Sequence, residues 1–393
     1  MAGSLLTRRL ADALGRRRTL LLDAAVFVAG TALAIVAPNY TVLLVARAVA
    51  GVAVGIASST VPLYLAEIAP AAVRGRLVTT QQLMITLGIL ASYCVDLALA
   101  TSGSWRAAFG VGLLPAAMFV LAMLRAPETP AWLYAHGQSE HARSVALQVA
   151  DPEETENLLQ GADEPATDLR SVLRSGTRPA LIVGVTLAAM QQLSGINAIL
   201  YFAPSIMERT GVSVSQSILY SVIVGAVNVA ATIVSFRLVD RLGRRPLLLG
   251  SLGAMAVSLA CLGLTLRLGS AYSSLSLVFM LTYIVAFAVG FGPIFWLLVA
   301  EIFPPRTRAA GASVSTATNW LSNFLVGLSF LPVVGLIGVG ATFWLFASAS
   351  AFTFAFVACY LPETKGRTFA QIQGDLRARW YTGAFSGTRT SPG

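Results

Sequence analysis

The sequence predicts an all-α membrane protein built from two related helical bundles, and three observations support this prediction. Hydrophobic residues make up 56% of the 393 residues and charged residues only 11%, whereas a soluble chain carries about 25% charged residues. Apolar runs long enough to cross a bilayer as helices recur along the chain. Several short motifs occur twice, in the same order and at nearly the same offset, as expected of a duplicated domain.

Ten apolar runs predict ten transmembrane helices. Basic residues gather in every second connection, whereas the intervening connections are short and poor in Arg and Lys. By the positive-inside rule, the basic connections and both termini face the cytoplasm. The runs cover residues 20–37, 41–63, 79–100, 107–124, 180–206, 217–238, 246–267, 276–300, 309–331 and 339–361.

A long polar connection divides the predicted helices into groups of four and six. It contains Asp151-Pro152-Glu153-Glu154, and residues 139–150 favour a helix. We therefore expect four segments: an incomplete N-terminal bundle at 1–133, a cytoplasmic linker with short helices at 134–178, a six-helix bundle at 179–361 and a cytoplasmic tail at 362–393.

Three motifs of the first half recur about 230 residues later. They are Asp12-x-x-Gly15-Arg16-Arg17 with Asp240-x-x-Gly243-Arg244-Arg245, Glu67-Ile68-x-Pro70 and Arg74 with Glu301-Ile302-x-Pro304 and Arg308, and Pro127-Glu128-Thr129 with Pro362-Glu363-Thr364. This parallel duplication is typical of secondary transporters. The symmetry demands two helices before Asp12, and the preceding 11 residues supply at most the end of one. We therefore expect 4 + 6 helices where the complete pattern has twelve.

Arg47 lies about two turns inside the second predicted helix, where an unpaired charge costs about 3 kcal/mol or more. We find no acid in a facing position, because Asp96 lies near the outer end of its helix. An acidic partner on one of the two absent helices would explain this arginine, so we assign Arg47 to coupling.

Further motifs run the length of the chain. They are Arg47-x3-Gly51-x3-Gly55, Pro62-x-Tyr64-x2-Glu67, Arg74-Gly75, Pro127-Glu128-Thr129-Pro130-x-Trp132-Leu133, Gln191-Gln192-x-Ser194-Gly195-x-Asn197-x3-Tyr201, Gly292-Pro293-x2-Trp296-x4-Glu301 and Pro362-Glu363-Thr364-Lys365-Gly366. Together they resemble the sugar porters of the major facilitator superfamily. The Gln-Gln and Pro-Glu-Thr motifs in combination are specific for that family. Arg8, Ala131, Phe202 and Phe295 depart from its pattern, but none removes a sugar-binding amide.

The resemblance implies two pseudo-symmetric helical bundles around a central sugar site. It places Gln82, Gln191, Gln192, Asn197, Asn228, Trp296 and Asn319 around the sugar, with Tyr201, Trp320 and Asn323 nearby. These residue types suit a sugar, because neutral amides both donate and accept hydrogen bonds and aromatic rings cover C–H faces. The alternative is that intramembrane Asn and Gln only join adjacent helices. In proton-coupled members the proton-binding Asp lies on the first helix.

Charged residues recur at the same ends of the helices in both halves. They are Asp12, Arg16, Arg17, Glu67, Arg74, Glu128, Asp240, Arg241, Arg244, Arg245, Glu301, Arg308 and Glu363. We expect ion pairs among them to close the cytoplasmic mouth while the cavity opens outward, in an alternating-access cycle. The alternative is that they only set topology and solubility, because exposed ion pairs contribute little.

The sequence thus predicts a transporter that moves a monosaccharide or polyol across the bacterial cytoplasmic membrane with protons, as a monomer in the lipid bilayer. We find no catalytic constellation, metal-ligand spacing, cofactor motif or nucleic-acid motif, which argues against an enzyme. Three alternatives stay open: a non-transporting fragment, a sugar sensor of the same family and a drug or metabolite antiporter of the same superfamily.

Overall fold

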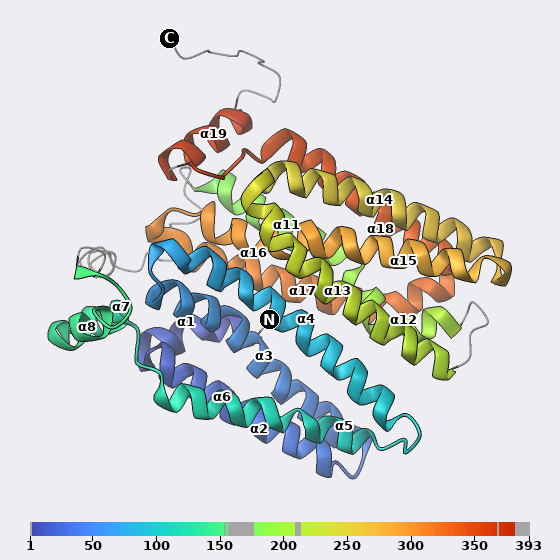
Figure 1. Cartoon of the computed structure of the whole chain (residues 1–393), viewed down its shortest axis with the longest axis horizontal. Helices are drawn as coiled ribbons and strands as arrows, with labels where there is room; N and C mark the ends of the chain where they lie inside the picture. Colours follow the sequence, from blue (N-terminus) through green and yellow to red (C-terminus); the bar gives the residue numbers. More distant parts are fainter. Residues whose placement is uncertain (1, 153–154, 156–176, 209–213, 368, 382–393) are drawn as a thin grey trace.

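The structure, a computed structural model, describes residues 2–152, 155, 177–208, 214–367 and 369–381. In this part of the chain it is helical and contains no strand, and ten helical segments are long and apolar enough to span a membrane. The ten predicted helices are therefore confirmed, with ends that differ by a few residues. Figure 1 shows two bundles side by side, one of helices α1–α6 and one of helices α11–α18.

The first bundle holds four membrane-spanning segments and one shorter helix. Its helices are α1 (Ala2–Leu14), α2 (Arg16–Val36), α3 (Tyr40–Ile68), α4 (Ala71–Leu99), α5 (Trp105–Val111) and α6 (Leu113–Arg125). Helices α5 and α6 form a single span interrupted at Gly112. Helix α3 begins where the Oδ1 atom of Asn39 accepts a hydrogen bond from the N–H of Val42, at 3.0 Å.

Helix α1 occupies the residues that the symmetry allowed as the end of a helix before Asp12. It was not among the predicted spans, because its 13 residues include polar and charged ones and form no apolar run. It packs on α3, where the hydroxyl of Ser4 donates a hydrogen bond of 3.0 Å to the carbonyl oxygen of Gly55. A side chain at Gly55 would lie only 3.1 Å from the backbone nitrogen of Ser4, so the small residue permits this close crossing.

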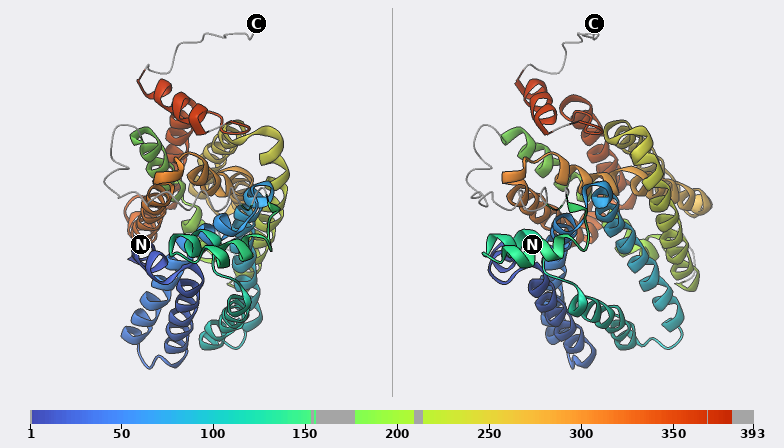
Figure 2. Two further views of the ribbon diagram at one scale, coloured as in Figure 1. Left: turned by 90° about the vertical axis from the view of Figure 1, so that its left-hand side faces the viewer. Right: turned by 60° about the vertical axis from the view of Figure 1, so that its left-hand side comes forward.

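Two short helices follow the first bundle. Helices α7 (Pro130–Ala135) and α8 (Ser139–Ala146) bury Leu133, Ala142 and Val145 against each other, which accounts for the helix predicted near 139–150. They lie at one end of the long helices (Figure 1) and in front of the helix ends when that end faces the viewer (Figure 2). About half of the predicted linker 134–178 lies outside the described residues.

The second bundle contains six spans and the larger core. Its elements are α11 (Arg178–Leu193), α12 (Ile196–Glu208), α13 (Val214–Leu242), α14 (Arg244–Leu268), η1 (Ser270–Tyr272), α15 (Ser273–Ala286), η2 (Phe287–Phe291), α16 (Gly292–Glu301), α17 (Pro305–Ile337) and α18 (Val339–Tyr360). Aromatic side chains such as Tyr283, Phe291 and Phe295 are fully buried in its centre. Helix α19 (Phe369–Tyr381) lies in the predicted tail and buries Ile372 and Leu376.

The two bundles meet chiefly along α4 and α13. A Cβ atom at Gly225 of α13 would lie 3.2 Å from the Cα of Leu90 on α4, so the two helices approach closely. Near the ends of the helices opposite α7 and α8, the Tyr93 hydroxyl donates a hydrogen bond of 2.6 Å to the carbonyl oxygen of Leu200 on α12. This bond connects the two halves directly.

Candidate functional site

Five of the amide side chains predicted to contact a sugar form one hydrogen-bonded network in the second bundle. They are Gln191, Gln192, Asn197, Asn319 and Asn323, from α11, α12 and α17. Asn319 donates to the Oε1 atom of Gln191 at 2.8 Å, and Gln192 donates to the Oδ1 atom of Asn319 at 3.0 Å. The structure therefore brings together residues that are more than 120 positions apart in the sequence.

Gln192 is the centre of this network. Its Oε1 atom accepts a hydrogen bond from Asn197 at 2.7 Å and a weaker one from Asn323 at 3.3 Å. The second N–H and the side-chain oxygen of Asn197 and of Asn323 have no hydrogen-bond partner among the described residues. These are the donors and acceptors that a bound polyhydroxylated ligand would use.

The network occupies a break in the first span of the second bundle. The span bends at Ser194 and Gly195. The φ of Gly195, +86°, is strained for other residues, and the Tyr283 hydroxyl donates to the buried carbonyl of Ser194 at 2.9 Å. A side chain at Gly195 would also collide with the ring of Phe346. Because the helix restarts at Ile196, Asn197 can turn back toward Gln192.

A second break supplies carbonyl groups to the same site. Residues Phe287–Phe291 form a π-helical turn before Gly292-Pro293, and Gln191 donates to the carbonyl of Phe291 at 3.1 Å. The Ser251 hydroxyl stabilises this turn, because it donates to Ala286 O at 2.7 Å and accepts from Phe291 N–H at 3.1 Å. Irregular backbone inside a membrane occurs where it lines a protein interior or a cavity.

The other predicted contact residues are not joined to this network. Gln82 and Asn228 are buried on α4 and α13, and Tyr201 is 57% exposed. The Nε1 atom of Trp320 is enclosed and has no partner among the described residues. Trp296 packs edge-on against Phe295. Whether these five side chains contact a ligand stays a prediction.

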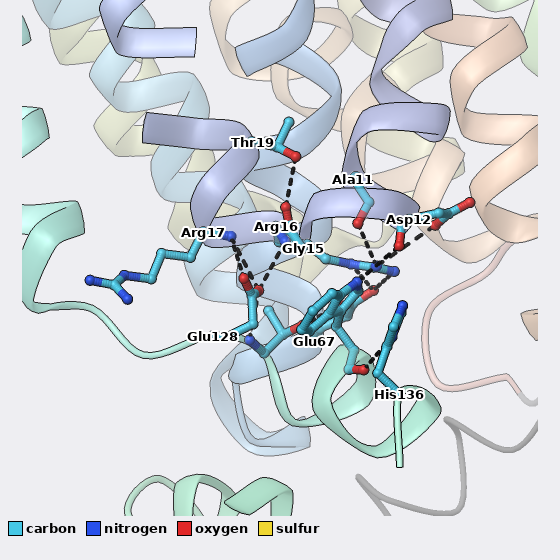
Figure 3. A network of polar contacts seen from close by, with 11 residues as sticks. Ala11, Asp12, Gly15, Arg16, Arg17, Thr19, Glu67, Glu128 and His136 are labelled. Carbon is cyan, nitrogen blue, oxygen red and sulfur yellow. Dashed lines mark hydrogen bonds and ion pairs between the residues drawn. The ribbon is translucent and has the colours of Figure 1, made fainter. Parts of the chain in front are cut away.

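The charged residues of the first half form a compact cluster where α2 begins (Figure 3). The Oε1 atom of Glu128 accepts from the backbone N–H of Arg16 at 2.9 Å and of Arg17 at 3.1 Å, so a carboxylate caps the N-terminus of α2. The Arg16 guanidinium forms an ion pair of 2.9 Å with Glu67, whose other oxygen accepts from the Thr129 hydroxyl at 2.6 Å. A longer contact of 3.7 Å joins Arg16 to Asp12.

The second half repeats this cluster at the start of α14. Glu363 accepts from the backbone N–H of Arg244 at 2.9 Å and of Arg245 at 3.0 Å. The Arg244 guanidinium pairs with Glu301 at 2.9 Å, and the Thr364 hydroxyl donates to the second oxygen of Glu301 at 2.6 Å. The two repeats of the sequence are therefore two copies of one structural unit.

Glu363 lies outside the membrane-spanning segments. Burial opposes its ionisation, but four backbone N–H groups donate to the carboxylate and their combined effect lowers the pKa of Glu363 below its usual value. The donors belong to Lys365, Arg244, Arg245 and Thr364. Glu363 is therefore held as an anion at neutral pH.

Each described cluster lies within one half of the molecule. The pairs Arg16–Glu67 and Arg244–Glu301 join helices of the same bundle, and Arg241 is exposed, with its carbonyl accepting from Lys365 at 3.0 Å. The side chains of Arg74, Asp240 and Arg308 lie outside the described part of the structure. Closure of the cytoplasmic mouth by ion pairs between the halves thus stays a prediction.

A comparison with known proteins decides the family. The model of the family described as "Sugar (and other) transporter" matches residues 1–376. The chain belongs to this family. The galactose-proton symporter of Escherichia coli (strain K12) is 37% identical over 376 residues, which cover 92% of this chain and 80% of that protein. The glucose transporter GlcP of Staphylococcus epidermidis is 36% identical over 381 residues, 95% and 85% of the two chains.

Solved structures agree with this assignment. The transporter superposes on the proton:xylose symporter XylE from E. coli with a TM-score of 0.81 and 28% identity, over 96% of this chain and 86% of that one. Its fold is therefore that of the major facilitator superfamily, as predicted. This family consists of multi-pass membrane transporters.

Arg47 of the transporter lies beside a small cavity of about 130 Å³ between α2, α3 and α5. Its guanidinium carbon stands 5.3 Å from the ring centroid of Phe109, a cation–π distance. No ion pair reaches Arg47 among the described residues. Its assignment to coupling stays a prediction.

Sequence reasoning missed a buried acid of the transporter, Asp23 on α2. Its side chain is 5% exposed, and it is the one acid inside the predicted helix 20–37. A lone acid within an apolar run is a signal that the sequence offered, because membrane-embedded acids are costly and commonly functional.

Proposed function

We propose that this transporter carries a monosaccharide or polyol across the membrane, coupled to protons, by alternating access. The observation that supports this most directly is the amide network around Gln192. It is uncharged, and Asn197 and Asn323 retain donors and acceptors without partners among the described residues. Such a site suits a neutral ligand with many hydroxyl groups.

The relatives support the same substrate class. Those reported above are named for galactose, glucose and xylose, and two of the three names state that transport is coupled to protons. The substrates differ among these relatives, so we propose the class of small sugars and not one member of it.

We further propose that each half moves as a unit, with bundles at 1–133 and 179–361 joined by the linker 134–178. The two charge clusters support this proposal, since each ties a helix start to the ends of neighbouring helices in its own half. Their Arg-rich side would face the cytoplasm, together with both termini. We expect the transporter to work as a monomer and to release its substrate chemically unchanged.

Uptake and binding measurements test this function. We would reconstitute the protein in liposomes and measure uptake of labelled galactose, glucose, xylose, arabinose and inositol, and measure their binding to purified protein. Gln192→Ala is expected to weaken binding roughly tenfold or more, because it also removes one hydrogen bond from each of its amide partners Asn197, Asn319 and Asn323. Gln148→Ala, on the exposed surface after α8, is the matched control and should bind like the wild type.

The alternatives predict other results. Sugar binding without uptake would indicate a sensor or a fragment that does not transport. Uptake of apolar cationic drugs without sugar binding would indicate an antiporter of the same fold. Tight sugar binding that Gln192→Ala leaves unchanged would contradict the proposed site.

A further inference from the structure

Asp23 is a buried carboxyl group that the sugar site and the charge clusters do not use. It lies on α2, and its side chain is 5% exposed. Its Oδ1 atom is enclosed and accepts no hydrogen bond, and no ion pair reaches the carboxyl group among the described residues. Because an ionised carboxylate in such surroundings is strongly disfavoured, Asp23 needs a proton or a cationic partner.

The packing of α2 on α3 locates this carboxyl group. A side chain at Gly30 would meet the backbone of Ala46 and Ala50, so this face of α2 lies against α3. Asp23 is seven residues before Gly30 and therefore on nearly the same face. Since α3 runs antiparallel to α2, the register places Asp23 about two turns further along α3, beside Ala53 and Ala57.

Three helices meet near that position. Gly55 is the residue at which α1 crosses α3, with the Ser4 hydroxyl bonded to its carbonyl at 3.0 Å. Helix α1 packs on both α2 and α3, and α2 packs on α3. The enclosed carboxyl group of Asp23 thus belongs to the junction of α1, α2 and α3.

Among the side chains that the structure describes, no charged or titratable group on the helices that pack against α2 neutralises Asp23. Those with described contacts bind elsewhere: Tyr64 to Pro127 O, Glu67 to Arg16, Arg106 to Ala37 O, Arg125 to Leu121 O and Arg47 to the Phe109 ring. Arg9 and Tyr40 are exposed, Asp12 lies beside Arg16 at the end of α1, and the side chain of Arg8 is outside the described residues. Arg16, Arg17 and Arg18 stand at the start of α2, about one to two turns before Asp23.

The junction is also connected to the sugar site. Helix α1 packs on α3 and on α17, the helix that carries Asn319 and Asn323. A rearrangement of α1 that admits water to Asp23 would therefore displace the helix that holds two amides of the site. Conversely, a ligand that fixes α17 would favour one arrangement of α1.

We propose that Asp23 is a proton-binding site that couples proton movement to sugar movement in this transporter. The proposal rests on the proposed function for the sugar, and it adds the residue that carries the proton. In the closed junction the carboxyl group holds the proton. When the junction opens to water on one side, the O–H bond breaks, the proton leaves to water and the carboxylate remains until a proton returns from the other side.

A transport experiment separates coupling from translocation. Asp23→Asn keeps the shape of the protonated form and cannot release a proton. We expect it to retain exchange of labelled for unlabelled sugar. A pH gradient should drive several-fold accumulation of sugar by the wild type and none by Asp23→Asn. Asp96→Asn removes an exposed acid of α4 and is the matched control, expected to accumulate sugar like the wild type. Accumulation by Asp23→Asn at the wild-type level would overturn the proposal.

A spectroscopic experiment tests the proton site without sugar. Infrared spectra of the reconstituted protein, recorded as a function of pH, should show a protonated-carboxyl C=O band that titrates in the wild type and in Asp96→Asn. The band should be absent from Asp23→Asn and shifted in Asp23→Glu. Its persistence in Asp23→Asn would overturn the proposal. If the band behaves as expected but no sugar binds or moves, the proton site stands and the proposed function fails.

Discussion

Gly15 and Glu128 occupy positions that depend on each other. A Cβ atom at Gly15 would lie 2.3 Å from the Oε2 atom of Glu128, and Gly243 stands in the same relationship to Glu363 at 2.8 Å. Each glycine has a φ near +90° directly before the helix that the glutamate caps. Because neither glycine has a side chain, the carboxylate of Glu128 can reach the first N–H groups of α2, and that of Glu363 can reach those of α14.

Gly15→Ala is predicted to lower the free energy of unfolding by about 2–4 kcal/mol, because it adds backbone strain and displaces the capping carboxylate. Gly338→Ala is the matched control. Gly338 has a φ of 83° and a ψ of 159°, close to the 90° and 163° of Gly15, and also stands directly before a helix, but nothing lies within 4 Å of the added methyl group. Thermal unfolding in detergent measures both, and equal losses would show that the contact with Glu128 has no effect.

The pair of Arg244 and Glu301 is predicted to contribute about 1 kcal/mol, more than a fully exposed pair, since both side chains are largely buried. A double-mutant cycle with Arg244→Gln and Glu301→Gln measures the coupling, and the same cycle on Arg16 and Glu67 is expected to agree. If ion pairs between the halves also close the cytoplasmic mouth, Glu301→Gln will raise the cytoplasmic accessibility of cysteines placed in the cavity. Unchanged accessibility would show that the pair stabilises only its own half.

Acid is predicted to weaken the cap at Glu363. Since the folded protein lowers the pKa of this carboxyl group, its contribution to stability is present at neutral pH and is lost as the pH falls below the usual value of 4.5. Glu363→Gln should therefore lower the melting temperature at pH 7 and have a smaller effect at pH 3.5. A difference between the two proteins that stays constant from pH 7 to 3.5 would contradict the assignment.

The long helices of the fold could be predicted because membrane insertion requires about 20 apolar residues, which is a local property of the sequence. The clustered amides could be predicted for a related reason: Gln191, Gln192 and Asn197 are close in sequence and unusual in an apolar run. Asn319 joins them only through packing of α17 on α11. Its place beside them was predicted from the resemblance to sugar porters and not from a local pattern.

Other features depend on tertiary contacts that no local pattern reveals. The π-helical turn at Phe287–Phe291 is stabilised by hydroxyl groups from two other helices, because Ser251 bonds to Ala286 O and Phe291 N–H and Ser235 donates to Val289 O. Helix α1 is too short and too polar to be recognised from hydropathy, and it is stabilised by its contact with Gly55. The burial of Asp23 likewise follows from the register of α2 on α3.

Trp320→Phe is predicted to weaken sugar binding about three- to tenfold while leaving stability unchanged or slightly raised. The Nε1–H group of Trp320 is enclosed without a partner, so the empty protein loses no hydrogen bond when it is removed. A sugar hydroxyl that accepts from it would lose one. Binding measured by calorimetry, with the melting temperature as the control, separates the two effects, and unchanged affinity would assign Trp320 to packing alone.

Tyr93→Phe is predicted to open the end of the cavity opposite α7 and α8. The Tyr93 hydroxyl bonds Leu200 O across the two halves at 2.6 Å, and this bond must break when the halves separate at that end. Its removal should favour the open state by about 1 kcal/mol, or roughly fivefold. Tyr220→Phe, on α13, is the matched control, because its hydroxyl has no hydrogen-bond partner among the described residues.

The shift can be measured with a cysteine at position 197 in a protein whose Cys94, Cys261 and Cys359 are replaced by serine. Asn197 belongs to the amide network, so the rate at which an impermeant thiol reagent modifies this position reports how open the cavity is from the outer side. The rate should rise severalfold with Tyr93→Phe and stay constant with Tyr220→Phe. Equal rates in all three proteins would show that contacts between α4 and α13, and not this hydrogen bond, keep that end closed.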